Sequence, residues 1–93
     1  MSAFCGTVDS DGLIISNGNF ACQYDSGQQK YTIGYNGNVN SGAAVVISLI
    51  QENPGISYTL DAYSNGFKLQ VYREASGAYT AIACKFNFIV MEL

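Results

Sequence analysis

Hydrophobic side chains recur at every second position along much of this chain. Such runs occupy residues 20–24, 31–35, 56–62, 67–71 and 86–90. A period of two places alternate side chains on opposite faces of a β-strand, and no segment shows the 3.6-residue period of a helix. The pattern therefore predicts an all-β protein.

Turn-forming dipeptides separate these runs. They are Asp11-Gly12, Asn17-Gly18, Ser26-Gly27, Asn36-Gly37, Ser41-Gly42, Pro54-Gly55, Asn65-Gly66 and Ser76-Gly77. Glycine and asparagine tolerate the positive φ angles of tight turns. We expect strands near residues 4–8, 12–16, 18–24, 29–36, 43–52, 56–63, 66–73 and 78–91, the last broken around Ala83–Cys84. Eight or nine short strands over residues 1–93 predict a single antiparallel β-sandwich with a jelly-roll-like topology.

Two of these strands carry apolar residues on both faces. Residues 43–50 contain valine, isoleucine and leucine at both odd and even positions, and residues 86–91 have Asn87 as their only polar residue. A strand of this kind is buried on both sides, whereas the outer face of a two-layer sandwich should be wet. We expect a neighbouring subunit to cover them, with loops of the same chain as the alternative. The predicted oligomer interface consists of Val46, Ile50, Phe86, Asn87, Phe88 and Ile89.

The composition excludes several functions. Charged residues make up 12% of the chain, which carries four basic residues and a net charge of −3; typical domains have about 25% charged residues. Nucleic-acid binding needs a cationic surface, so we expect no nucleic-acid partner. No apolar run approaches the ~20 residues of a membrane span, and we expect no membrane insertion. The chain has no histidine, which excludes a Ser–His–Asp triad, and we expect no catalytic residues and no enzymatic activity.

Cysteines and the N-terminal residues bear on the compartment. The three cysteines, Cys5, Cys22 and Cys84, are compatible with small buried side chains, with one disulfide plus a free thiol, or with a nucleophile. The opening MSAFCGTV lacks the basic and apolar regions of a signal peptide. The location therefore stays open, with a virion or an extracellular surface favoured.

Asp9 and Asp11 are the only candidates for a metal. The segment Asp9-Ser10-Asp11-Gly12 places oxygen ligands at alternate positions, as calcium loops do. It lacks the downstream glutamate of an EF-hand, and the alternative is a turn closed by aspartate side chains. We expect no cofactor, with calcium kept as a weak alternative.

Tyrosine points to recognition. The chain has seven tyrosines and no tryptophan, and tyrosine with asparagine, serine and glycine is typical of adaptable binding surfaces. A sugar could stack on tyrosine rings while amide groups hold its hydroxyls; the alternative is packing at strand edges. The candidate ligand-binding residues are Tyr63, Asn65, Gln70, Tyr72 and Tyr79.

The order of short motifs resembles a trimeric jelly-roll module of phage tail-fibre-like and bacterial surface proteins, with a C1q/TNF-like topology. The similar pieces are Gly6-Thr7-Val8 with Asp11-Gly12-Leu13-Ile14, Gly18-Asn19-Phe20 with Gly27 and Lys30-Tyr31-Thr32-Ile33, Ala44-Val45-Val46-Ile47, Asn65-Gly66-Phe67-Lys68-Leu69, and Phe86-Asn87-Phe88-Ile89-Val90. The chain departs from the module in its cysteines and in lacking a proline before residue 44. The resemblance implies homotrimers used for assembly or for recognising cell surfaces, and it transfers no binding residue.

Together these observations lead to two functional hypotheses. The first is a non-enzymatic structural or adhesive module, a homotrimer that serves as the recognition tip of a fibre or surface protein. The alternative is a small lectin whose partner is a cell-surface glycan.

Overall fold

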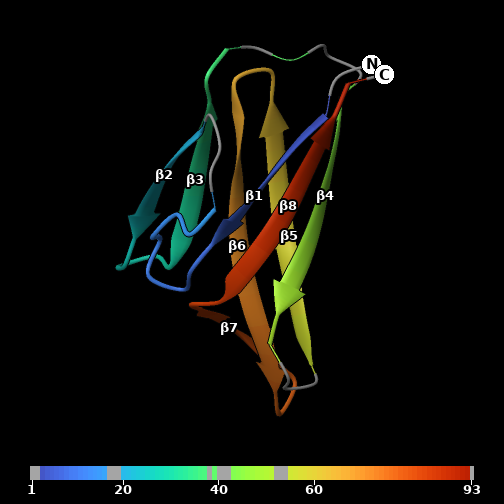
Figure 1. The fold of residues 1–93 in the computed structure, drawn as a ribbon. Helices are drawn as coiled ribbons and strands as arrows, with labels where there is room; N and C mark the ends of the chain where they lie inside the picture. Colours follow the sequence, from blue (N-terminus) through green and yellow to red (C-terminus); the bar gives the residue numbers. More distant parts are fainter. Residues whose placement is uncertain (1–2, 17–19, 38, 40–42, 52–54, 93) are drawn as a thin grey trace.

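The computed structural model describes residues 3–16, 20–37, 39, 43–51 and 55–92. They form eight strands in two antiparallel sheets packed face to face, so the fold is a β-sandwich (Figure 1). The smaller sheet has the order β1 (Ala3–Val8), β8 (Lys85–Met91), β4 (Ala44–Ile50). The larger sheet has the order β2 (Phe20–Asp25), β3 (Lys30–Tyr35), β6 (Gly66–Ala75), β5 (Ile56–Tyr63), and β7 (Ala78–Ile82) also pairs with β6. None of the described residues lies in a helix that could cross a membrane.

The predicted all-β antiparallel sandwich is confirmed. The break expected around Ala83–Cys84 is present, because β7 ends at Ile82 and β8 begins at Lys85. The jelly-roll topology stays a prediction. Residues 18–19 and 52, at the ends of two predicted strands, lie outside the described residues, as do Asn17-Gly18, Ser41-Gly42 and Pro54.

One predicted strand, 12–16, is absent as a regular strand. Its only ladder contact is the antiparallel bridge between Val8 and Ile14. The preceding turn is tight: Gly12 donates its N–H to the Asp9 carbonyl at 2.9 Å, and Asp9 donates its own to the Leu13 carbonyl at 2.8 Å. The chain therefore turns back on β1 too sharply for a second full strand to form.

Strand pairs are joined by turns of the expected chemistry. Ser76 and Gly77 have φ angles of 53° and 79° and connect Ala75 to Ala78, which pair with each other. A two-residue loop with both φ angles positive is the type I′ turn, whose twist matches that of a hairpin. The Ser76-Gly77 dipeptide thus sets the register of β6 against β7.

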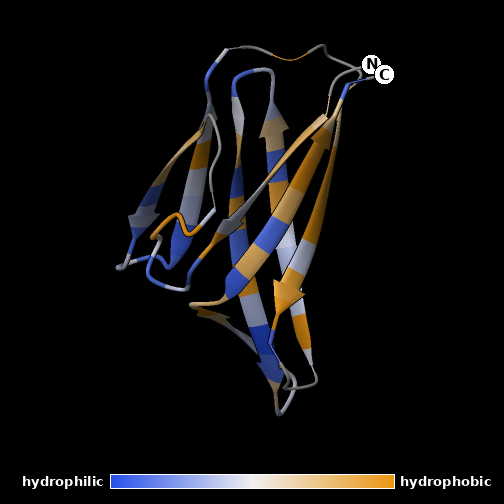
Figure 2. Cartoon of the chain, in the orientation of Figure 1, coloured by the Kyte–Doolittle hydropathy of each residue, from blue (hydrophilic) through white to orange (hydrophobic). Residues whose placement is uncertain are grey.

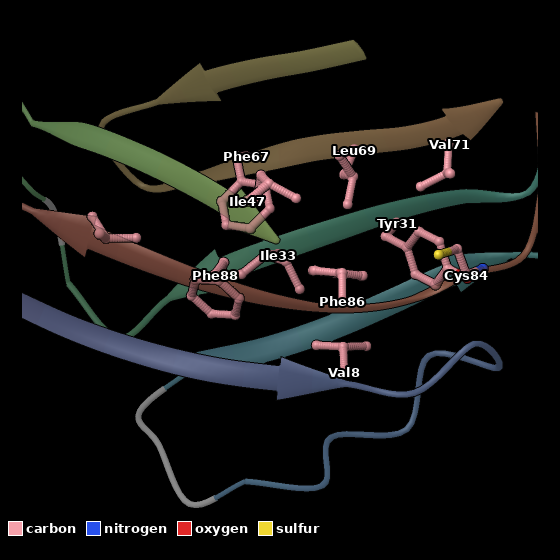
Figure 3. Close-up of a cluster of buried hydrophobic side chains, with 11 residues drawn as sticks. Val8, Tyr31, Ile33, Ile47, Phe67, Leu69, Val71, Cys84, Phe86 and Phe88 are labelled. Carbon is pink, nitrogen blue, oxygen red and sulfur yellow. The ribbon is translucent and has the colours of Figure 1, made fainter. Parts of the chain in front are cut away.

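The core lies between the two sheets (Figure 3). The small sheet contributes Val8, Ile47, Phe86, Phe88 and Val90, and the large sheet contributes Tyr31, Ile33, Phe67, Leu69 and Val71. Core rings from opposite sheets meet edge to face; Phe67 and Phe88, for example, have centroids 5.1 Å apart and planes at 71°. This geometry adds to the free energy of burying the rings.

Phe86 and Phe88 were predicted to belong to an oligomer interface, and this prediction is wrong. Both are buried in the core of a single chain. The physical reason is the strand period: Asn87 faces outward, so its two neighbours must face inward. Of the six predicted interface residues, Val46, Ile50, Asn87 and Ile89 remain on the surface.

The cysteines are all free thiols in different surroundings. Cys84 is buried, Cys22 is half-buried and Cys5 is exposed. Burial raises the pKa of the Cys22 thiol to about 11, which keeps it protonated at neutral pH. The interpretation as small buried side chains therefore holds for Cys84 and fails for Cys5.

Candidate functional site

The outer face of the small sheet is the first candidate surface. Strand register aligns its outward residues in rows across β1, β8 and β4. The rows are Ala3–Met91–Ala44, Cys5–Ile89–Val46 and Thr7–Asn87–Ser48, followed by Lys85 beside Ile50. Two of these rows are wholly apolar, counting the cysteine, and the only charged side chain among these positions is that of Lys85.

Large hydrophobic side chains on this face are open to solvent. Val46 is 53% exposed, Ile89 44% and Ile50 41%. In Figure 2 most of β4 carries the hydrophobic colour. Because about half of each residue is exposed, no described loop of the chain covers them fully. Burying one such aliphatic side chain fully contributes roughly 1.5–3 kcal/mol.

A polar row divides this apolar face. Thr7 donates its hydroxyl to the Asn87 Oδ1 atom at 2.7 Å, across the β1–β8 pair. Asn87 therefore has a partner for its carbonyl oxygen within the chain. The hydrogen bond fixes the side chain of the one central polar residue of β8.

The sandwich is closed on one side and open on the other. Along β1, Thr7 donates its N–H to the Ser16 hydroxyl at 2.9 Å and accepts from the Ile15 N–H at 3.1 Å, so the segment 13–16 covers that edge. At the opposite edge of the sheet, no described strand pairs with the free side of β4. In the larger sheet, β5 is also an edge strand, and its Tyr58 is 41% exposed.

This free edge lacks the usual protection of edge strands. β4 reads AVVISLI, without a charge, a proline or a glycine. Natural sheets protect exposed edges with charged residues, prolines or bulges, because an unprotected edge pairs readily with another chain. The apolar face and the free edge meet at β4, which makes this strand the centre of the candidate interaction surface.

The outer face of the large sheet is polar and holds most of the predicted ligand residues. Lys68, Gln70 and Tyr72 alternate with the buried Phe67, Leu69 and Val71 along β6 and therefore face outward. Tyr63 and Asn65 lie where β5 turns into β6. Tyr63, Asn65, Gln70 and Tyr72 thus lie on or beside one face.

Tyr79 lies apart from the other four. Tyr79 lies on β7 and pairs with Glu74 of β6, whereas Tyr63 pairs with Gly66 at the other end of β6. Gly66 and Glu74 are eight positions apart along β6, or about 27 Å at ~3.4 Å per residue. Tyr79, at 64% exposure, cannot contact the same small ligand as Tyr63.

Several polar groups on this face already have partners. Tyr72 donates its hydroxyl to Gln70 Oε1 at 2.6 Å, and Gln70 Nε2 donates to the Gln28 carbonyl at 2.7 Å. Tyr63 donates to Asp61 Oδ2 at 2.6 Å, and this hydrogen bond raises the pKa of Tyr63. Gln70 therefore keeps one N–H and one lone pair for a ligand, while Tyr63 is 44% exposed as a residue.

Two open hollows adjoin on this face. The larger, about 230 Å³, is lined by Tyr63, Asn65 and Lys68 together with Gly34 and Gly66 among others. The smaller, about 110 Å³, is lined by Lys68, Gln70 and residues of β3 and β5. Both are smaller than the ~300–1,000 Å³ typical of ligand pockets. They can hold a ring-sized group and little more.

The sequence alone missed Lys68, Gly34 and Gly66 as site residues. In the sequence, Lys68 is one of a few scattered cations, and the two glycines occupy ordinary strand or turn positions. The available signal was glycine inside a strand pattern, which marks the close approach of a backbone or a ligand. Strand pairing brings the two glycines together, because Gly34 lies opposite Gly66.

The predicted calcium ligands close a turn. Asp9 Oδ1 accepts the Ser10 N–H at 2.8 Å, and Asp11 Oδ1 accepts the Leu13 N–H at 3.0 Å. The Asp11 contact is that of an Asx turn, the alternative raised from the sequence. Among the described residues no group of three or more acidic or cysteine side chains gathers as a metal site.

Comparisons with known proteins supply no relative. No protein-family model, curated protein or solved structure matches this chain.

Proposed function

We propose that this protein is a non-enzymatic structural or adhesive module that assembles with copies of itself through the outer face of its small sheet. The observation that carries the proposal is the exposure of Val46, Ile50 and Ile89 on one nearly uncharged face. The resemblance to a trimeric fibre module favours a homotrimer at the tip of a fibre or surface protein. Several copies held together would multiply weak contacts with a cell surface.

The size of the face indicates how strong this contact is. Three strands ~4.8 Å apart, of about seven residues at ~3.4 Å each, give a footprint of about 340 Å². Two such footprints amount to about 700 Å², below the roughly 1,000 Å² expected of a stable interface. We therefore expect association to depend on concentration and the free edge of β4 to add to the contact.

A pair of lysine substitutions tests this proposal. Val46→Lys places a charge in the centre of the apolar face, and because Val46 is half exposed the monomer should stay folded. Ser57→Lys, on the exposed outer side of β5, is the matched control. We expect light scattering to show loss of assembly for Val46→Lys and wild-type assembly for Ser57→Lys. Equal behaviour of both variants would move the interface away from this face.

A second candidate function is binding of a sugar by the outer face of the large sheet. The observation that favours it is the cluster of Tyr63, Asn65 and Gln70 around the two hollows. A glycan array tests this function: binding to at least one common sugar is expected, and silence across all of them contradicts it.

A further inference from the structure

Gly34 occupies a position for which the fold gives no reason. It lies inside β3, its φ angle is outside the left-handed region, and a Cβ built on it would meet no atom of the described residues beyond its chain neighbours within 4 Å. Glycine in the middle of a strand is destabilising relative to alanine. A glycine inside a strand often marks a bulge or the close approach of another backbone or of a ligand, and at Gly34 neither backbone strain nor contact with the described residues accounts for it.

Gly66 is explained differently. A Cβ at this position would collide with the carbonyl oxygen of Ile33 on the neighbouring strand. Its lack of a side chain therefore serves the packing of β6 against β3. The two glycines are paired in register and together form a bare patch of backbone on an otherwise polar face.

This patch is part of the floor of the larger hollow. Tyr63, the register partner of Gly66, stands at its border, and Asn65 and Lys68 also line it. Because the Tyr63 hydroxyl is donated to Asp61, the tyrosine offers chiefly its ring to a ligand. A bare backbone floor with an exposed aromatic ring at its border suits a flat, ring-shaped molecule with C–H groups on one face, as in a pyranose sugar.

Charge narrows the ligand class. Lys68 is the only charged residue that lines the larger hollow, and the adjoining hollow adds Lys30 and Asp61. Two lysines and one aspartate thus line the two hollows, in a chain whose net charge is −3. A lysine ammonium forms charge-assisted hydrogen bonds with carboxylates.

We propose that the Gly34 hollow binds a sugar that carries a carboxylate, with the ring on the Gly34–Gly66 patch beside Tyr63 and the carboxylate at Lys68. The inference rests on the second candidate function and names its ligand class and position. The site lies on the large sheet, so it leaves the assembly face of the small sheet uncovered.

Two sugars that differ only in the carboxylate test the proposal. Methyl glucuronide and methyl glucoside are titrated into the wild-type protein while amide resonances are followed by NMR. We expect the glucuronide to shift resonances of residues 32–34 and 63–68, and to bind about tenfold more tightly than the glucoside because of its charge-assisted hydrogen bonds.

Three variants locate the site. Gly34→Leu fills the hollow without meeting other atoms at its Cβ, so it should fold and lose glucuronide binding. Lys68→Met should reduce glucuronide affinity to that of the glucoside. Ser57→Leu, exposed on the same face outside both hollows, should bind as the wild type does.

The outcomes distinguish a failure of the proposed ligand class from a failure of sugar binding itself. Equal affinity for both sugars that is unchanged in Lys68→Met would overturn the claim that the ligand carries a carboxylate. Sugar binding would still stand. Binding that survives Gly34→Leu overturns the position. Binding of neither sugar overturns this inference, and the glycan array then decides separately whether any sugar is bound.

Discussion

At the scale of single residues, Tyr31 ties together three parts of the sandwich. Its ring is buried, stacked on Tyr24 with centroids 4.6 Å apart. Its hydroxyl donates to the Ser10 carbonyl at 2.6 Å and accepts from the Cys84 N–H at 3.0 Å. One side chain of β3 thus satisfies backbone groups from the turn after β1 and from the β7–β8 connection. Buried polar groups need such partners.

Removing the Tyr31 hydroxyl should destabilise the fold. Tyr31→Phe leaves the Ser10 carbonyl and the Cys84 N–H without their partner, which we expect to lower the free energy of unfolding by about 1–3 kcal/mol. Tyr79→Phe, on an exposed tyrosine, should change it by less than about 0.5 kcal/mol. Urea unfolding measures both, and equal stability of the two variants would contradict this role.

The buried hydroxyl of Tyr31 should also make the stability of the fold sensitive to alkali. Burial raises the pKa of Tyr31 from 10.0 to about 12, so the folded state holds this proton more tightly than the unfolded chain. Its contribution is fully present below pH 10 and is lost as the pH rises through about 12, a loss on the order of 2 kcal/mol. Urea midpoints measured across this range should fall less steeply for Tyr31→Phe than for the wild type. Parallel curves would contradict the prediction.

At the scale of elements, the period of two was a reliable guide. Phe67, Leu69 and Val71 alternate with polar residues in the sequence and lie in the core as predicted. In the 86–91 run both sets looked apolar, so the sequence did not distinguish the buried Phe88 from the exposed Ile89. Only Asn87, read as an outward position, could have assigned the faces.

Other features depend on contacts between distant strands and could not be predicted from local pattern. The segment 12–16 has the composition of a strand, yet hydrogen bonds of the 9–13 turn limit it to a bridge. In the candidate site, the tyrosines and amides were visible in the sequence. The Gly34–Gly66 pair was not, because the sequence does not state which strand lies beside β3.

From the pairing of β3 with β6, we expect alanine substitutions at its two glycines to change stability in opposite directions. Gly66→Ala forces a Cβ against the Ile33 carbonyl and should destabilise the fold by about 2 kcal/mol or more. Gly34→Ala meets no described residue within 4 Å beyond its chain neighbours and should stabilise the fold by about 0.5–1 kcal/mol. Thermal unfolding measures both, at about 4–8 °C per kcal/mol for a domain of this size. A Gly66→Ala variant as stable as Gly34→Ala would contradict the register.

At the scale of the whole molecule, the two outer faces differ in chemistry. The small sheet presents valine, isoleucine and methionine around a single polar row, whereas the large sheet presents lysines, amides and tyrosines. An apolar face next to an unprotected edge fits self-assembly, and a polar face with ring-sized hollows fits recognition. Assembly through the first face would leave the second exposed in several copies, the arrangement that multivalent binding requires.

A charge in the polar row should act on the assembly rather than on the monomer. Asn87 is exposed in the single chain, so Asn87→Asp should leave monomer unfolding nearly unchanged. In an assembly the unpaired carboxylate would be buried at a cost of several kcal/mol. We expect weaker association at neutral pH that recovers as the pH falls below about 4, where the carboxyl group is protonated. Association that does not respond to pH would place Asn87 outside the interface.

The mass of the wild-type protein in solution tests the central claim most directly. Sedimentation equilibrium from micromolar to millimolar concentration should show species that are multiples of the 10.0 kDa chain, with a homotrimer as the expected end point. A single species of 10.0 kDa across the whole range would contradict self-assembly through the face formed by β1, β8 and β4.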